Sequence, residues 1–207
     1  MHRIAVAVGL VMMLGIGQQI CAASEAQKAK AAENKAEILE DKAAPGGSKK
    51  PPAPSQMITK TEAQAVDPNG EEPLDDTITC LARTIYWEAQ GEGVATMEAI
   101  ASVVMNRVGK KGFPNTVCGV VKQGREEHAC QFSWWCDGRS DQAEDEKSYA
   151  IAKEIARRAL NRQLKDTTHG ALYFHLRKVK TDWSAEYKRT VRIGDFDFYK
   201  PRDGAAK

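Results

Sequence analysis

The amino-acid composition of this chain changes at Leu74, and that change limits how much of the chain can form a hydrophobic core. From Ser24 to about Gly47 the residues are mostly Ala, Lys, Glu and Gln, and almost nothing except Ile38 and Leu39 could face a core. Residues 46–54 are rich in Gly, Ser, Lys and Pro, a composition that is typical of a semi-extended spacer.

The region after Leu74 concentrates the Trp, Tyr, Phe and Val residues and four cysteines. Its length of about 130 residues supports one domain with one core. We therefore predict a disordered or weakly helical tether over residues 24–74 and a folded domain over residues 75–203. The alternative for the tether is a helix that docks on the domain, which its interrupted apolar pattern disfavours.

The N-terminus has the pattern of a signal peptide over residues 1–23. His2 and Arg3 precede an apolar run that ends near Ile16, which is short for a membrane span. The sequence Cys-Ala-Ala at residues 21–23 suits cleavage before Ser24, so we expect export to the periplasm, the cell wall or the medium. Lipid attachment at Cys21 is the alternative, but Leu and small residues do not precede it.

The four cysteines of the exported chain, Cys80, Cys118, Cys130 and Cys136, suit two disulfides in an oxidising compartment. A zinc site is the competing use, but the spacing contains no C-x-x-C pair. Sequence alone allows three pairings. We predict Cys118 with Cys130 and Cys80 with Cys136, because each pair would tie a helix to the Trp-rich loop between them.

Hydrophobic spacing and capping residues predict a mainly α-helical domain with a small β component, an α+β fold. The predicted helices cover residues 77–91, 95–108 and 142–164, with a short helical turn over residues 115–121. The predicted strands cover residues 171–175, 189–193 and 196–200, the last two forming a hairpin around a Gly-Asp turn.

Two acidic residues, Glu88 and Glu92, lie four apart near the end of the first predicted helix. They share a helix face, so each disfavours ionisation of the other, and Tyr86 and Trp87 could add desolvation. Both effects favour a carboxylic acid that stays protonated near neutral pH, as protonation of a glycosidic oxygen requires. A solvated, acidic helix end is the ordinary explanation of such a pair.

Several ordered blocks favour the chemical explanation. From Cys80 onward the chain resembles the SleB and CwlJ type of bacterial cell wall hydrolases. The resembling blocks are residues 86–92 (Tyr-Trp-Glu-Ala-Gln-Gly-Glu), 103–108 (Val-Val-Met-Asn-Arg-Val), 112–121, 130–134 (Cys-Gln-Phe-Ser-Trp), 136–138, 170–175 (Gly-Ala-Leu-Tyr-Phe-His), 193–195 and 198–199.

This resemblance implies a compact lysozyme-like domain related to lytic transglycosylases, which would cleave peptidoglycan between N-acetylmuramic acid and N-acetylglucosamine. Carried over by position, the family's catalytic glutamate is Glu88. The sequence departs from the family pattern at Gln90, where Arg is frequent, at Phe196, where His is common, and before Trp183, where Thr181 and Asp182 stand and a Pro is frequent.

One acid is sufficient for cleavage if the sugar's own 6-hydroxyl attacks the anomeric carbon, which is lytic transglycosylation. Hydrolysis requires a second carboxylate, and its candidates are Glu92, Glu98, Asp137 and Asp141. The resemblance favours transglycosylation, while the spacing of the acids does not decide between the two reactions.

Candidate substrate-binding residues combine aromatic faces, which stack on sugars, with polar groups that bind hydroxyls. Packing in the core is the alternative for Phe132 and Trp134, and Asn106 and Arg107 are expected to be structural first. The candidates are Tyr86, Glu92, Gln131, Phe132, Ser133, Trp134, Tyr173 and His175.

Two other functional classes stay open at this point. One is a peptidoglycan-binding module without activity, and the other is a metal-dependent amidase with His128, His169 and His175 as ligands, although these lack an H-E-x-x-H spacing. A net charge of +2 gives no case for nucleic acid or an anionic membrane. We expect no metal, no cofactor, peptidoglycan as the partner and a monomer, and the sequence identifies no regulatory partner.

Overall fold

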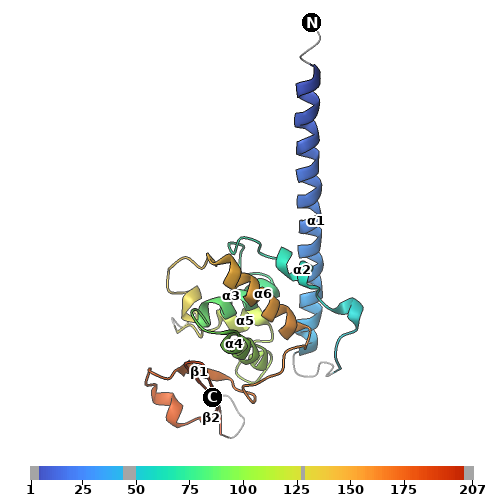
Figure 1. Cartoon of the computed structure of the whole chain (residues 1–207). Coiled ribbons are helices and arrows are strands. Elements are labelled where there is room, and N and C mark those ends of the chain that lie inside the picture. The colour runs from blue at the N-terminus through green and yellow to red at the C-terminus, as the bar shows by residue number, and fades with distance from the viewer. Residues whose placement is uncertain (1–4, 44–49, 127–128, 203–207) are drawn as a thin grey trace.

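The computed structural model describes residues 5–43, 50–126 and 129–202, with side chains from residue 22 onward. Helices form most of the body, and a three-stranded sheet lies beside it (Figure 1). The helices are α1 (Ala5–Ala43), α2 (Lys60–Ala65), α3 (Thr77–Glu88), α4 (Val94–Arg107), α5 (Val117–Lys122) and α6 (Glu146–Leu160). The strands are β1 (Tyr173–Leu176), β2 (Lys188–Ile193) and β3 (Phe196–Lys200), and short 3₁₀ turns cover Pro54–Gln56, Ser133–Trp135 and Asp182–Ala185.

Helix α3 is the centre of the helical body and packs against α4, α5 and α6. The Asp76 carboxylate caps it by accepting hydrogen bonds from the backbone N–H groups of Ile78 and Thr79. Every residue from Thr77 to Tyr86 is buried, so α3 has no solvent face until its last turn. The predicted helix over residues 77–91 is confirmed, but it ends at Glu88, before the left-handed Gly91.

The sheet has the order β1-β3-β2 with antiparallel neighbours. The predicted hairpin is confirmed, with Gly194 at φ +55° in its turn. Strand β3 is buried along Phe196 to Tyr199, and Phe198 is fully enclosed. The α+β fold class predicted from the sequence is therefore the observed one.

The structure departs from the predicted tether at its first half, residues 24–43. These residues continue α1, and Ala32, Ala36 and Leu39 on one face of that helix are buried in the core. The Glu40 carboxylate accepts a hydrogen bond from the Val117 N–H at the start of α5. Small alanine side chains allow the close helix approach, which is why the sequence shows no strong apolar stripe.

The second half of the predicted tether is also packed on the domain. Asp67 and Arg83 form a buried ion pair at 2.8 Å, and the Tyr149 hydroxyl donates to the same carboxylate. Lys153 Nζ donates to backbone carbonyls of residues 64, 66 and 67. Burial alone would raise the pKa of Asp67, but the hydrogen bonds from Arg83 and Tyr149 hold it below its ordinary value. Residues 46–49 of the predicted Pro-rich spacer lie outside the described residues.

The cysteines form two disulfides, but the predicted pairing is wrong. Cys80 pairs with Cys118, and Cys130 pairs with Cys136. The first pair joins α3 to α5 because these helices pack directly against each other. The second pair closes the Trp-rich loop on itself, a short-range pairing that the assumption of helix-to-loop links missed.

Among the described residues, no helix combines the length and the apolar character needed to cross a membrane. His2 and Arg3 of the predicted signal peptide lie outside the described residues, as does the predicted domain end at residue 203. Cleavage before Ser24 stays a prediction, and it would leave the docked part of α1 on the exported chain.

Docking of α1 predicts that Leu39→Ala lowers the free energy of unfolding by about 2–5 kcal/mol, because a fully buried leucine leaves a cavity. Ile38→Ala is the matched control, since Ile38 is 51% exposed on the adjacent position of the same helix. Urea unfolding of the full chain measures both changes. Equal, small effects of the two substitutions would mean that this segment is a tether.

Candidate active site

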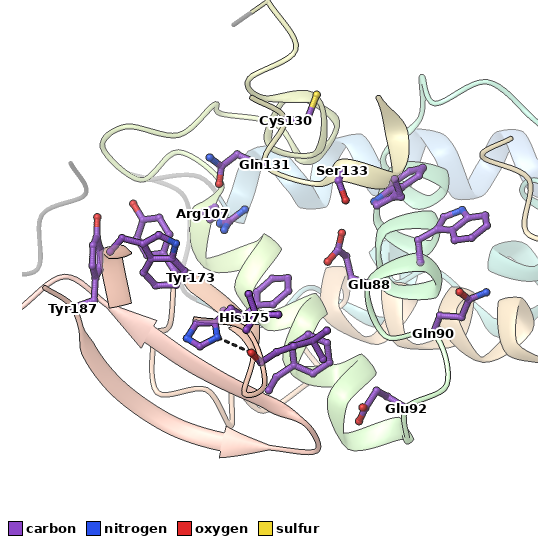
Figure 2. Close-up of a pocket in the computed structure, with 17 residues that line it drawn as sticks. Glu88, Gln90, Glu92, Arg107, Cys130, Gln131, Ser133, Tyr173, His175 and Tyr187 are labelled. Carbon is purple, nitrogen blue, oxygen red and sulfur yellow. Dashed lines mark hydrogen bonds between the residues drawn. The ribbon is translucent and has the colours of Figure 1, made fainter. Parts of the chain in front are cut away.

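A groove with a volume of about 880 Å³ lies between the end of α3 and the sheet (Figure 2). The helical side contributes the turn after α3, the end of α4 and the Cys130–Cys136 loop, and the other side consists of β1 and the segment that follows it. Its polar and aromatic lining includes Trp87, Glu88, Gln90, Glu92, Arg107, Gln131, Ser133, Trp134, Tyr173, His175, Trp183 and Tyr187.

Glu88 is the last residue of α3, and its carboxyl group points into the groove (Figure 2). The side chain is half-buried, and burial raises its pKa to about 7 against a smaller opposing effect of the Arg107 charge. Within the described part of the chain, no group donates a hydrogen bond to this carboxyl. Near neutral pH a large fraction of Glu88 is therefore protonated.

Arg107 ends α4 and reaches the groove from the interior. Its Nε donates to the Leu172 carbonyl oxygen at 2.7 Å, and its guanidinium lies over the rings of Phe113, Phe132 and Tyr173. Burial lowers its pKa to about 10, so it remains a cation at neutral pH. From the sequence we predict mainly a structural role for Arg107. The structure shows that it both binds the Leu172 carbonyl and forms part of the groove wall.

Glu92 lines one end of the groove, where the two walls touch. Its carboxylate accepts a hydrogen bond from Thr96 Oγ1 at 3.1 Å. The hairpin turn packs so closely here that a Cβ added at Gly194 would collide with both of these side chains. The tip of the sheet therefore packs directly against Glu92 and Thr96 of the helical body.

Aromatic side chains form the wall on the sheet side. The ring of Tyr173 lies 4.8 Å from Tyr187 and 5.8 Å from Trp183. Burial raises the pKa of Tyr173 to about 12, with a further contribution from Tyr187. Rings that are half-exposed on a groove wall can stack on the apolar faces of sugars.

His175 is placed by hydrogen bonds at both ring nitrogens. Nδ1 lies 2.8 Å from the Leu176 carbonyl oxygen, which can only accept, so Nδ1 carries a hydrogen (Figure 2). Nε2 lies 3.0 Å from the Tyr199 hydroxyl, and the two rings stack at a centroid distance of 5.1 Å. The imidazole is therefore a fixed part of the aromatic wall.

Two predicted site residues do not line the groove. Tyr86 is buried, packs against Tyr149 and accepts a hydrogen bond from the Asp145 N–H. Phe132 is 1% exposed and packs in the core under Arg107. Both side chains point to the interior because neighbouring residues on α3 and on the Trp-rich loop alternate between the core and the groove. The other six predicted binding residues, Glu92, Gln131, Ser133, Trp134, Tyr173 and His175, all line it.

Three of the four acids considered for a second catalytic carboxylate are outside the groove lining. Glu98 forms an ion pair with Arg158, Asp137 accepts from the Arg139 N–H in a turn, and Asp141 lies beside Trp135. Glu92 is the one that lines the groove.

His128 of the alternative amidase site lies outside the described residues. Among the residues that the structure describes, no three or more His, Cys, Asp or Glu side chains are grouped so that they could hold a metal ion.

Arg107, Trp183 and Tyr187 are among the groove residues that were not predicted as site residues from the sequence. Trp183 and Tyr187 follow β1 in a segment without periodic spacing, so no pattern indicated their direction. Their aromatic character between two predicted strands was the available signal. Arg107 could have been found from its place at the end of a helix that packs beside Glu88.

The model of the family described as Cell Wall Hydrolase matches residues 91–199 of the chain. The match begins three residues after Glu88 (91 − 88) and includes both the hairpin and the aromatic wall. It covers more than half of the sequence.

Two curated relatives are spore cortex-lytic enzymes. The one from Bacillus cereus is 31% identical over 136 residues, which are 64% of this chain and 47% of that protein. The one from Halalkalibacterium halodurans is 30% identical over 125 residues, which are 60% of this chain and 34% of that protein. The chain thus spans about half or less of the length of these relatives.

A similar solved structure is the catalytic domain of the germination-specific lytic transglycosylase SleB from Bacillus anthracis. It is 30% identical, the alignment covers 64% of this chain and 99% of that chain, and the TM-score is 0.50.

The close approach of the hairpin turn predicts that Gly194→Ala lowers the free energy of unfolding more than the matched control Gly138→Ala. Both glycines have positive φ, so both substitutions introduce backbone strain of about 1–3 kcal/mol. A Cβ at Gly138 meets nothing within 4 Å, whereas one at Gly194 also displaces the hairpin from Glu92. Urea unfolding compares the two variants, and equal losses would show that the hairpin turn is not held closely.

The raised pKa of Glu88 predicts a pH-dependent stability difference between the wild type and Glu88→Gln. The unfolded chain releases the Glu88 proton near pH 4.3, whereas the folded chain keeps it until about pH 7. Between these values the wild type loses stability as pH rises, and glutamine does not. The variant's stability relative to the wild type should therefore rise by about 3 kcal/mol from pH 4 to pH 8. A difference that stays constant across this range contradicts the raised pKa.

Proposed function

We propose that this chain, which belongs to the cell wall hydrolase family, cleaves peptidoglycan glycan strands between N-acetylmuramic acid and N-acetylglucosamine as a lytic transglycosylase. The observation that carries the proposal is the Glu88 carboxyl, which lies in a groove and has a pKa raised to about 7. An acid of this kind is protonated often enough at neutral pH to donate a proton.

In the first step Glu88 donates its proton to the bridging oxygen as the bond from that oxygen to the muramic acid C1 breaks. The N-acetylglucosamine end leaves with a free 4-hydroxyl. The Glu88 carboxylate then takes the proton of the muramic acid 6-hydroxyl, whose oxygen bonds to C1. The product carries a 1,6-anhydro ring, no water is consumed, and Glu88 returns to its protonated form.

The arrangement of the other acids supports a reaction with one catalytic carboxylate. Hydrolysis needs a second carboxylate at a defined separation from the first, about 5 Å or about 6.5–9.5 Å. Glu92 is the groove acid available for that role, and its carboxylate is engaged by Thr96 beneath the hairpin turn. A structural role for Glu92 leaves Glu88 to act as both acid and base.

The groove walls suit a polysaccharide. Tyr173, Trp183 and Tyr187 on one side present aromatic surface, while Gln131 and Ser133 on the other offer amide and hydroxyl groups; Trp134, which also lines the groove, is 7% exposed and packs mainly in the core. Sugars are bound by this combination of ring stacking and hydrogen bonding. The similar SleB domain belongs to a germination-specific lytic transglycosylase, which supports the same reaction type here.

The compartment follows from the substrate. Peptidoglycan lies outside the cytoplasmic membrane, so we propose that the chain is exported by the signal peptide over residues 1–23 and acts there as a monomer without a cofactor. The two disulfides suit an oxidising compartment.

Release of muropeptides from purified sacculi, followed by mass spectrometry, tests the proposed reaction. The wild type should release products with 1,6-anhydro ends. Glu88→Gln preserves shape but has no proton to donate, so its rate should fall by about 100- to 10,000-fold.

Glu92→Gln is the matched control and should keep the reaction and its anhydro products. Reducing ends together with loss of activity in Glu92→Gln would mean hydrolysis with two carboxylates. Sacculus binding without any release by the wild type would mean a non-catalytic binding module.

A further inference from the structure

A second surface feature lies on the other side of the Trp-rich loop from Glu88. The Trp135 ring carries two cations, with Arg125 Cζ 4.9 Å and Lys122 Nζ 5.9 Å from its centroid. Two hollows, of about 530 and 550 Å³, are both lined by Lys122, Arg125 and Trp135. We call the site that these three residues form the Trp135 pocket.

The two cations of the Trp135 pocket form no ion pair with a carboxylate of the described residues. Among the described residues, no Asp or Glu lies within ion-pair distance of Lys122 or Arg125. A cation over a ring face is held in place by the ring while its remaining N–H groups stay available. Two such cations, the half-buried Lys122 and the exposed Arg125, form a site for an anionic group.

The acids of the two hollows indicate where an anion can bind. The first hollow also contains Glu71, Glu72 and Asp141, which repel anions. Of the described residues that line the second hollow, Glu126 is the one acid, and the amide groups of Gln123 and Gln131 lie beside it. A carboxylate is therefore favoured in the second hollow, between the two cations and the glutamines.

The second hollow lies next to the groove of Glu88. Gln131 lines both, and Trp134 and Trp135 are adjacent residues of which the first lines the groove and the second the hollow. The Cys130–Cys136 disulfide closes this loop and fixes the two sites relative to each other. A substrate in the groove can therefore extend a branch into the hollow.

We propose that the Trp135 pocket binds a carboxylate of the stem peptide attached to the muramic acid whose glycosidic bond lies at Glu88; this rests on the proposed function. The stem peptide carries free carboxylates, whereas N-acetylglucosamine is neutral and the lactyl carboxyl of N-acetylmuramic acid is bound in the amide that joins the peptide. The pocket thereby favours glycan strands that keep their peptides over bare strands.

Calorimetric titration of the full chain carrying Glu88→Gln tests the pocket without turnover. The probes are the disaccharide N-acetylglucosaminyl-N-acetylmuramic acid with a tetrapeptide and the bare disaccharide whose lactyl carboxyl is capped as a methyl amide, so that it carries no carboxylate. Adding Lys122→Ala and Arg125→Ala should weaken binding of the peptide-bearing probe about tenfold, as two exposed ion pairs warrant. Binding of the bare disaccharide should not change.

The matched control adds Lys147→Ala and Lys165→Ala instead, two exposed lysines outside the pocket, and should change neither affinity. A peptide with its carboxylates amidated should bind with the same affinity before and after the pocket substitutions. An equal loss for both disaccharides, or no loss for either, overturns the proposal. Poly(glycerol phosphate) serves as a third probe. If the pocket substitutions weaken binding of this probe alone, the ligand is a phosphate polymer and the proposal is overturned.

Failure of the proposed function would show differently from failure of this inference. If the proposed function is wrong, the wild-type chain releases no muropeptides from sacculi. The titration reports separately whether the pocket binds a carboxylate.

Discussion

Desolvation of one carboxyl group, that of Glu88, is the constraint on which the proposed chemistry depends. Helix α3 is buried along almost its whole length, so the residue at its end is enclosed by protein on most sides. Burial raises the Glu88 pKa more than the nearby Arg107 charge lowers it, and no hydrogen bond stabilises the ionised form in the described structure. An acid suited to the proposed proton donation results because α3 ends inside a groove.

The rest of the structure keeps that groove formed by joining the sheet to the helical body at both ends. At one end Arg107 and Asn106, in the last turn of α4, donate to the Leu172 and Ala171 carbonyls just before β1. At the other end Glu92 and Thr96 meet the hairpin turn at Gly194. The residues next to the acid therefore support the walls, and the aromatic wall is positioned by the sheet.

The sequence predicted the elements that periodic spacing and turn residues specify, including α3, α4, α6 and the hairpin at Gly194. It did not predict the docking of α1, because alanines such as Ala32 and Ala36 pack closely without an apolar signature. The disulfide pairing and the inward direction of Phe132 depend on tertiary contacts that no local pattern encodes. Six of the eight predicted binding residues reach the groove because the family blocks from which they came are brought together by the fold.

The most direct measurement is an NMR titration of the Glu88 side-chain carboxyl carbon in the full chain, assigned by comparison with Glu88→Gln. We predict that this resonance titrates at a pH of about 7, well above the other surface carboxylates. A midpoint near the ordinary glutamate value of about 4.3 would mean that the carboxyl is solvated and ionised at neutral pH, and would contradict its role as the proton donor.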